Sequence, residues 1–187
     1  MKVDIFNTDK KYNIIYADPP WKYNSRNNKN TRFGGGAIGH YSLMSFDDIA
    51  KLPIENIAAD NCALFMWCTF PKLPQQLNIL KSWGFKYKTI GFNWIKTNKR
   101  NGKPFFGIGY YTKSNSEICI LATRGKMKPV SNKVSSIVIE SRREHSRKPD
   151  CIRWKIVELF GDLPRIELFA RQNIDGWDCW GDQAPEN

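Results

Sequence analysis

Residues 12–21 have the sequence YNIIYADPPW, a short apolar run that stops at two consecutive prolines. The run is rich in β-branched and aromatic residues, which favour strands. Pro19 and Pro20 hold φ at about −65° and lack a backbone N–H, so a strand cannot continue through them. The stretch therefore predicts a β-strand over residues 12–17 that ends directly before Asp18 and a stiff turn.

Beyond this strand, segments with a strand pattern alternate along the chain with segments that have a helical pattern. Strands are predicted at 62–68, 85–96, 117–123, 136–140 and 165–170, and helices at 45–51, 71–83 and 149–160. Ser45 and Asp48 have the spacing of a capping box, and Gly84 suits the end of the second helix. The alternation predicts a single α/β domain over residues 1–187, with a mainly parallel sheet and helices on both faces. Trp67, Trp94 and Trp154 lie in strand or helix patterns and are predicted to be core residues.

The predicted sheet indicates where a ligand binds. In open α/β sheets, ligands bind beyond the carboxyl ends of the strands. Asp18 and Arg171 each follow a predicted strand. We therefore expect both side chains at that edge.

Composition points to a polyanionic partner. The chain has 29 Lys and Arg against 18 Asp and Glu, a net charge of +11. Basic residues gather in two acid-free loop segments, 22–32 and 96–113, a pattern that suits phosphate contacts. Five cysteines without paired spacing, together with two histidines, argue against a metal site. The sequence has neither a signal peptide nor a membrane span, so we expect a soluble cytoplasmic protein.

The Asp18-Pro19-Pro20-Trp21 turn carries groups that can activate an amino group for methylation. An adenine amino group is a poor nucleophile, and acceptors on its two protons favour a nitrogen whose lone pair can attack a methyl carbon. The Asp18 carboxylate and the Pro19 carbonyl are two such acceptors, and the indole of Trp21 offers a face on which a flipped base can stack. An ordinary strand-ending turn is the alternative for the tetrapeptide by itself.

Further motifs occur in a fixed order along the chain. They are Gly39–Ser45 (GHYSLMS), Asn93–Asn98 (NWIKTN), Ser116–Leu121 (SEICIL), Arg147–Asp150 (RKPD), Glu167–Arg171 (ELFAR) and Trp180–Gln183 (WGDQ). With the DPPW turn they resemble the family typified by the catalytic subunit of the eukaryotic messenger-RNA adenosine methyltransferase, which also includes many bacterial and phage DNA adenine methyltransferases. The resemblance extends from about Tyr12 to Gln183.

The resemblance implies a Rossmann-like methyltransferase with a permuted order, in which the catalytic loop precedes the strand that clamps the cofactor, S-adenosyl-L-methionine. It implies three sets of residues. The catalytic set is Asp18, Pro19, Pro20 and Trp21. The cofactor set is Asn13, Ile14, Asp18, Ser116, Arg171, Asn173, Asp182 and Gln183. The substrate set is Lys22, Tyr23, Tyr41, Lys96, Lys99, Arg100, Arg142, His145, Arg147 and Lys148.

Where the eukaryotic members have a lysine before the strand glutamate, this chain has Ser116, so the cofactor carboxylate needs another partner. Ser116 itself or Lys113 is expected to serve.

The resemblance leaves the substrate open. A small chain without an RNA-targeting appendage favours site-specific adenine methylation of DNA by a bacterial or phage enzyme, and RNA N6-adenosine is the alternative. Cytosine methyltransferases of similar chemistry typically have Ser in place of Asp18. A non-catalytic nucleic-acid-binding paralogue is a further alternative, and a homodimer also stays open.

Overall fold

The computed structural model describes residues 1–22, 43–107, 109, 111–143 and 147–185. Its elements follow the order predicted from the sequence. They are β1 (Tyr12–Ala17), α1 (Phe46–Ala50), α2 (Ile54–Ile57), β2 (Ala58–Cys68), the 3₁₀ turn η1 (Phe70–Lys72), α3 (Leu73–Ser82), β3 (Lys86–Thr97), β4 (Ser116–Arg124), β5 (Ile137–Ser141), α4 (Cys151–Phe160), β6 (Arg165–Leu168) and β7 (Asp178–Trp180). Every predicted strand is confirmed, whereas α2 and β7 were not predicted.

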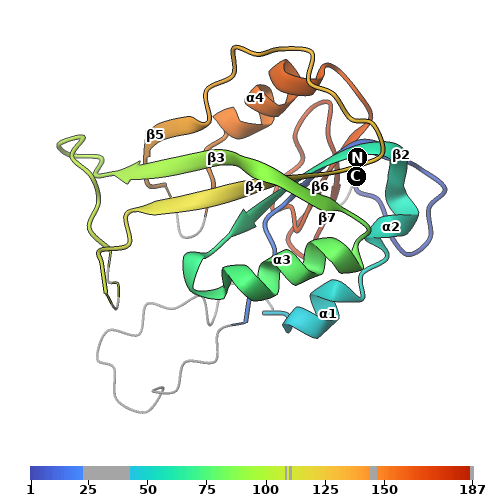
Figure 1. The fold of residues 1–187 in the computed structure, drawn as a ribbon, viewed down its shortest axis with the longest axis horizontal. Coiled ribbons are helices and arrows are strands. Elements are labelled where there is room, and N and C mark those ends of the chain that lie inside the picture. Colours follow the sequence, from blue (N-terminus) through green and yellow to red (C-terminus); the bar gives the residue numbers. More distant parts are fainter. Residues whose placement is uncertain (23–42, 108, 110, 144–146, 186–187) are drawn as a thin grey trace.

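Within the described residues, seven strands form one sheet in the order β5-β3-β4-β2-β1-β6-β7 (Figure 1). Parallel pairing joins β1 to β2, β1 to β6, β6 to β7 and β3 to β5. The strand β4 runs antiparallel to β2 and β3. The prediction of a mainly parallel sheet is thus confirmed, and β4 is the exception because no helical crossover separates it from β3. Its direction brings the first residues of β4 to the edge where β1, β3, β5 and β6 end.

Helices cover both faces of the sheet, as predicted. In Figure 1, α4 lies on one side of the sheet, and α1, α2 and α3 lie on the other. One core cluster joins the sheet to α1–α3 through Ile49, Ile57 and Leu80, and a second joins it to α4 through Ile152 and Ile156. The Rossmann-like arrangement is therefore a three-layer α/β fold.

The strand β1 lies between β2 and β6, and its last residues are buried on both faces. Ile14, Ile15 and Ala17 are wholly buried, and Tyr16 is nearly so. A strand covered on both faces needs a continuous apolar run, which is what residues 14–17 supply. This rigid central strand fixes the position of Asp18.

Local signals set the ends of the helices. Ser45 caps α1, since its side chain accepts a hydrogen bond from the backbone N–H of Asp48 at 3.1 Å. Gly84 follows α3 at φ +76°, a conformation that glycine adopts without strain.

Two of the three predicted core tryptophans are buried, but Trp154 is 62% exposed on the outer face of α4, so that prediction was wrong. Its place in a helical pattern did not identify which face of α4 meets the sheet.

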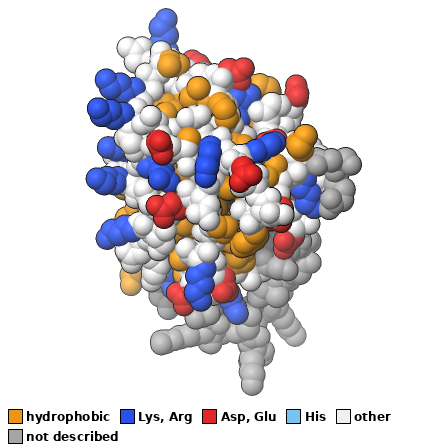
Figure 2. All heavy atoms as spheres, turned by 90° about the vertical axis from the view of Figure 1, so that its right-hand side faces the viewer, with side chains coloured by type: hydrophobic (Ala, Val, Ile, Leu, Met, Phe, Trp, Pro, Cys, Tyr) orange, Lys and Arg blue, Asp and Glu red, His pale blue; other side chains and the backbone are white. Residues whose placement is uncertain are grey.

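The molecular surface shown in Figure 2 is the right-hand side of Figure 1. Lys and Arg side chains line one side of this face, and Asp and Glu side chains are scattered among them. The basic side chains that give the chain its net charge of +11 are therefore not confined to the carboxyl ends of the strands. Among the described residues, the structure has no helix that is both long and apolar enough to cross a membrane.

Candidate active site at the carboxyl ends of the strands

The Asp18-Pro19-Pro20-Trp21 turn follows β1 and is fixed by backbone hydrogen bonds. The N–H of Trp21 donates to the Pro19 carbonyl at 2.9 Å, and the N–H of Met44 donates to the Pro20 carbonyl at 2.9 Å. Lys22 donates back to the Met44 carbonyl at 3.0 Å. A carbonyl oxygen has two lone pairs, so Pro19 keeps acceptor capacity beyond its bond to Trp21. The turn therefore presents a fixed acceptor next to Asp18.

Trp21 is placed differently from the sequence prediction. Its side chain is only 5% exposed, its ring stacks on Phe46 with centroids 5.3 Å apart, and its Nε1 donates to the Trp67 carbonyl at 3.3 Å. A ring enclosed in this way leaves almost no face for a base. The expectation of a stacking platform does not agree with this placement, and Trp21 instead braces the turn against the core.

Asp18 belongs to a charged cluster that also contains Lys96 of β3, Glu117 of β4 and Lys148, which precedes α4. The Nζ atom of Lys148 lies 2.8 Å from Asp18 Oδ2 and 3.4 Å from Glu117 Oε2. The Nζ atom of Lys96 lies 2.5 Å from Glu117 Oε1. The Lys148 side chain is only 11% exposed, and its Nζ lies 5.5 Å from the centre of the Trp67 ring. The cluster joins three strands and the start of α4 at one edge.

The two carboxylates of the charged cluster differ in their proton affinity. Burial raises the pKa of Asp18, and the attraction of Lys148 offsets only part of that rise. Burial acts on Glu117 in the same sense, but Lys148 and Lys96 outweigh it and lower the pKa of Glu117. For Lys148, burial favours the neutral form, yet Asp18 and Glu117 together hold its pKa well above the ordinary value. Lys148 and Glu117 are thus held in their charged forms more firmly than Asp18 is.

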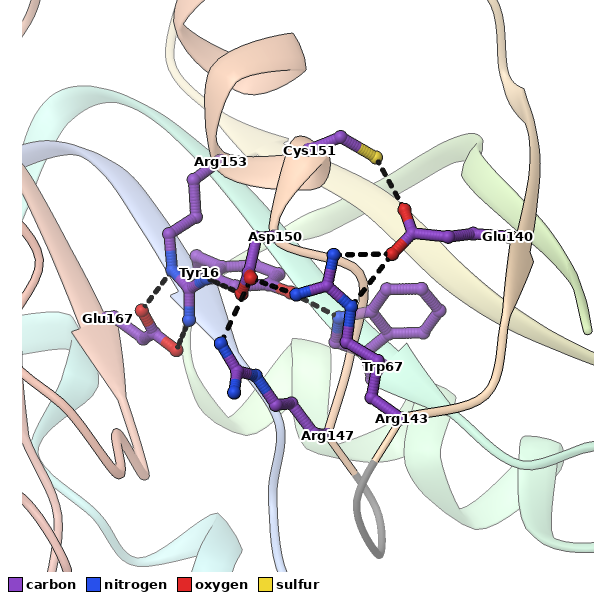
Figure 3. Close-up of polar contacts among 9 residues, drawn as sticks. All are labelled: Tyr16, Trp67, Glu140, Arg143, Arg147, Asp150, Cys151, Arg153 and Glu167. Atoms are coloured by element: carbon purple, nitrogen blue, oxygen red, sulfur yellow. Dashed lines mark hydrogen bonds and ion pairs between the residues drawn. The ribbon is translucent and has the colours of Figure 1, made fainter. Parts of the chain in front are cut away.

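A network around Asp150 fixes the segment that carries Lys148 (Figure 3). Asp150 accepts hydrogen bonds from Arg143, from Arg147 at 3.0 Å and from Arg153 at 3.2 Å. Arg153 also forms a bidentate pair with Glu167 of β6, at 2.6 Å and 2.7 Å. These contacts tie the start of α4 to β6, and Lys148 lies between two of the anchored residues.

The same edge continues over β6 and β7. Arg171 lies close enough to Asp18 to lower its pKa, although less than Lys148 does. The backbone N–H of Ala170 donates to the Trp180 carbonyl at 2.9 Å, so Arg171 and the exposed Asp182 and Gln183 follow neighbouring strand ends. The expectation that Asp18 and Arg171 share an edge is confirmed.

Aromatic rings also meet at this part of the edge. The ring of Trp180 has its centre 5.3 Å from that of Phe169 and 6.2 Å from that of Phe6. Phe6 belongs to an N-terminal segment that pairs with β7 through a bridge between Lys2 and Cys179. Sequence reasoning missed this segment because it is too short and too polar to show a strand pattern.

Three residues of the predicted cofactor set lie elsewhere. Asn13 is near the start of β1, where its side chain donates to the Asn61 carbonyl at 2.9 Å, and Ile14 is wholly buried in the core. Asn173 accepts a hydrogen bond from Cys179 Sγ and lines a hollow of about 810 Å³ at the amino ends of β1, β6 and β7, together with Tyr12. At about 3.3 Å per residue, β1 puts Asn13 and Ile14 more than 10 Å from Asp18. The structure therefore does not group these three residues with Asp18, and their assignment to the cofactor site stays a prediction.

Other predicted residues are placed as follows. Ser116 is half-buried at the start of β4, next to Glu117, whereas Lys113 is exposed. Lys22 is exposed beside the turn. Lys99, Arg100 and Arg142 gather beyond the ends of β3 and β5. Tyr23, Tyr41 and His145 lie outside the described residues.

Lys148 and Lys96 were predicted to contact substrate, whereas the structure buries most of both side chains against Asp18 and Glu117. Glu117, which the family motif contains, joins the site through these lysines. The sequence held one signal that Lys148 is fixed in place: it stands directly before Pro149 and Asp150 at the start of a helix, where the chain is tightly held.

A Rossmann-like sheet that carries a DPPW turn and a buried lysine–carboxylate cluster at its carboxyl edge defines a methyltransferase domain. The chain belongs to the MT-A70 family, whose profile matches residues 12–183. The expected family is thereby confirmed.

Individual relatives resemble nearly the whole chain. A Mycoplasma protein named type II methyltransferase M.MunI is 34% identical over 193 residues, which cover 95% of this chain and 80% of that protein. Human N(6)-adenine-specific methyltransferase METTL4 is 27% identical over 96% of this chain and 39% of its own length. An Arabidopsis thaliana protein named N(6)-adenosine-methyltransferase MT-A70-like is 25% identical over 97% of this chain, which spans only 24% of that protein.

Proposed function

We propose that this chain transfers a methyl group from S-adenosyl-L-methionine to the N6 amino group of adenine in DNA. The observation that carries the proposal is the carboxylate of Asp18, held beyond β1 against Lys148 and next to the carbonyl of Pro19. The names of the relatives support adenine as the target base, and the type II methyltransferase from Mycoplasma supports DNA. RNA is the second candidate, because the plant relative is named for adenosine.

The side chains at the edge fit the cofactor. The methionine part of the cofactor bears a carboxylate and an ammonium group, which match the cation of Lys148 and the anion of Asp18. Lys148 is a better partner for the carboxylate than Lys113, since it already lies in the cluster with Asp18. Arg171 and the rings of Phe169 and Trp180 suit an adenosine moiety at the ends of β6 and β7.

The reaction requires the chain to activate the amine. The bound cofactor supplies an electrophilic methyl group on a sulfonium. Asp18 and the Pro19 carbonyl accept hydrogen bonds from the two amino protons, which localises the lone pair on the nitrogen. With its lone pair localised, the amine would take the methyl group as that group leaves the sulfonium sulfur, and water would remove one of the amino protons. Fixed acceptors cost no reorganisation during this step.

The charged cluster also suggests how Asp18 becomes available to bind the cofactor and the target amine. In the structure Asp18 contacts Lys148, and the raised pKa of Asp18 shows that this contact only partly compensates its burial. Lys148 would bind the cofactor carboxylate, and Asp18 would then be available to the ammonium group and the amine. A homodimer is a further part of the proposal, and light scattering on the purified protein tests it.

Transfer of labelled methyl groups tests the proposal. Wild-type protein is incubated with methyl-labelled cofactor and duplex DNA, single-stranded DNA or RNA, and label in the polymer is counted. We expect label in DNA and none with Asp18→Ala, whose cofactor and nucleic-acid binding are measured in parallel. Label in RNA alone would shift the substrate to RNA. Turnover retained by Asp18→Ala would contradict the role of Asp18.

A further inference from the structure

A basic hollow lies beyond the ends of β3 and β5, and its described lining shares no residue with the charged cluster. It has a volume of about 520 Å³ and is lined by Thr97, Asn98, Lys99, Arg100, Arg142 and Arg143. Four of these six residues are Lys or Arg, and Lys99, Arg100 and Arg142 are exposed. Among the residues that the structure describes, no acidic side chain lines this hollow. Its composition therefore matches an anionic ligand.

Backbone contacts give the hollow a fixed shape. The N–H of Arg142 donates to the Thr97 carbonyl at 3.2 Å, which joins the ends of the two strands. The turn that carries Lys99 and Arg100 is closed by Asn98, whose N–H donates to the Lys103 carbonyl at 2.9 Å. The basic side chains thus extend from anchored strand ends.

The arginines of the hollow differ in their partners. Arg143 is committed to Glu140, at 2.7 Å, and to Asp150, so it closes the side of the hollow towards α4. The guanidinium of Arg142 instead lies over the ring of Phe105, 3.4 Å from its centre. A guanidinium plane with an aromatic ring on one face is a platform on which a nucleobase stacks with the other face.

The hollow lies on the same edge of the sheet as Asp18. From β1, the order of the strands leads through β2 and β4 to β3 and then β5. At about 4.8 Å per strand, the end of β3 is about 14 Å from that of β1, and the end of β5 is about 19 Å from it. With a rise of about 3.4 Å per nucleotide along the axis of a stacked strand, this separation equals about four to six nucleotides, and fewer where the strand is extended.

We propose that the basic hollow is a flanking-nucleotide subsite: Lys99 and Arg100 hold backbone phosphates, and Arg142 on Phe105 stacks a base, several nucleotides from the target adenine. This inference rests on the proposed function and names the part of the strand that the chain reads beside the reacting base. Phosphate contacts position the strand, and a single stacked base gives a tolerant preference for sequence context.

A salt titration of binding tests the phosphate contacts without any need for turnover. Fluorescence anisotropy measures the affinity of single-stranded DNA that contains one adenine, over a series of salt concentrations. Lys99→Gln/Arg100→Gln removes two positive charges from the hollow. Lys86→Gln/Lys88→Gln is the matched control, because it removes two exposed charges from the opposite end of β3. We expect the first variant to make the negative slope of log K against log salt shallower by about 1.4, and the control to leave the slope unchanged. Equal effects of the two variants would overturn the subsite.

A second measurement locates the contacts along the strand. One phosphate at a time is replaced by a neutral methylphosphonate, and one flanking base at a time by an abasic nucleotide. In wild-type protein, we expect one or two neutral positions to weaken binding, and one abasic position to weaken it by at least about fivefold. The abasic effect should vanish in Arg142→Gln, while the neutral-phosphate effect should vanish in Lys99→Gln/Arg100→Gln.

Methyl transfer to the same oligonucleotides separates this inference from the proposed function. Transfer to intact DNA without any position-specific effect on binding would overturn the subsite alone. Position-specific binding without methyl transfer by wild-type protein would contradict the proposed function and leave the subsite supported. Tighter binding of an acidic peptide than of any oligonucleotide would overturn the subsite by assigning the hollow to a protein partner.

Discussion

Replacing Lys148 with methionine removes the cation that the charged cluster shares between two carboxylates. In the structure its Nζ lies 2.8 Å from Asp18 and 3.4 Å from Glu117, and the side chain is 11% exposed. Methionine has a similar length and fills the space over Trp67 without a charge. The change therefore tests electrostatics more than packing.

The expected magnitude follows from the contact that the cofactor carboxylate loses. A hydrogen bond to a charged group contributes about 1.5–3 kcal/mol, which corresponds to a cofactor affinity about 10- to 140-fold weaker in Lys148→Met. A second effect concerns Asp18. Because Lys148 lowers the pKa of Asp18, its removal raises that pKa further, and the acidic limb of the activity profile should move to higher pH.

Isothermal titration calorimetry with the cofactor measures the affinity, and methyl transfer as a function of pH measures the second effect. Lys96→Met is the matched control, since Lys96 is 14% exposed and pairs with Glu117 in the same cluster. We expect the control to bind cofactor close to the wild-type affinity. Wild-type affinity in Lys148→Met, or equal losses in both variants, would refute the assignment of Lys148 to the cofactor.

Three further predictions concern groups around the site. Because burial raises the pKa of Asp18, kcat should fall on acidification at a pH where an ordinary aspartate, with a pKa of 3.8, is still ionised. A kcat that stays unchanged down to pH 3.8 would contradict the role of this carboxylate. Arg153→Met leaves Glu167 buried without its bidentate partner and should lower the free energy of unfolding in urea by about 3–5 kcal/mol. Most of this loss should return when Glu167 is also replaced by methionine, and a double variant as unstable as the single one would argue against the pair. In Gly181→Ala the new methyl group would lie 2.6 Å from the Ala170 carbonyl oxygen, so the backbone beside the site must shift, at a cost of about 1–3 kcal/mol in stability. A variant that melts and binds cofactor like the wild type would contradict that prediction.

Much of the fold could be predicted because each strand of the central sheet is an apolar run bounded by strong stop signals. Pro19 and Pro20 end β1 where predicted, and Gly84 separates α3 from β3. The three residues of β7 are too few to show a period, so that strand was missed. The antiparallel direction of β4 was also not predicted, although no helix was predicted between residues 96 and 117, where a parallel connection would need one.

The site was only partly predictable, for a related reason. A residue that follows a strand must lie at the carboxyl edge, which correctly grouped Asp18 and Arg171. The contact between Lys148 and Asp18 joins residues 130 positions apart, and no local pattern encodes it. The neighbouring arginines made Lys148 resemble part of a solvated nucleic-acid surface. Trp21 was misplaced because its motif suggests stacking, whereas its surroundings enclose it.

The central claim, methylation of adenine at N6, is tested most directly by identifying the product. DNA treated with the protein and an isotopically labelled cofactor is digested to nucleosides and analysed by mass spectrometry against authentic standards. The arrangement of Asp18 and the Pro19 carbonyl predicts labelled N6-methyldeoxyadenosine, absent from the Asp18→Ala reaction. Label in N4-methyldeoxycytidine, or in no nucleoside while the cofactor is bound, would contradict the account.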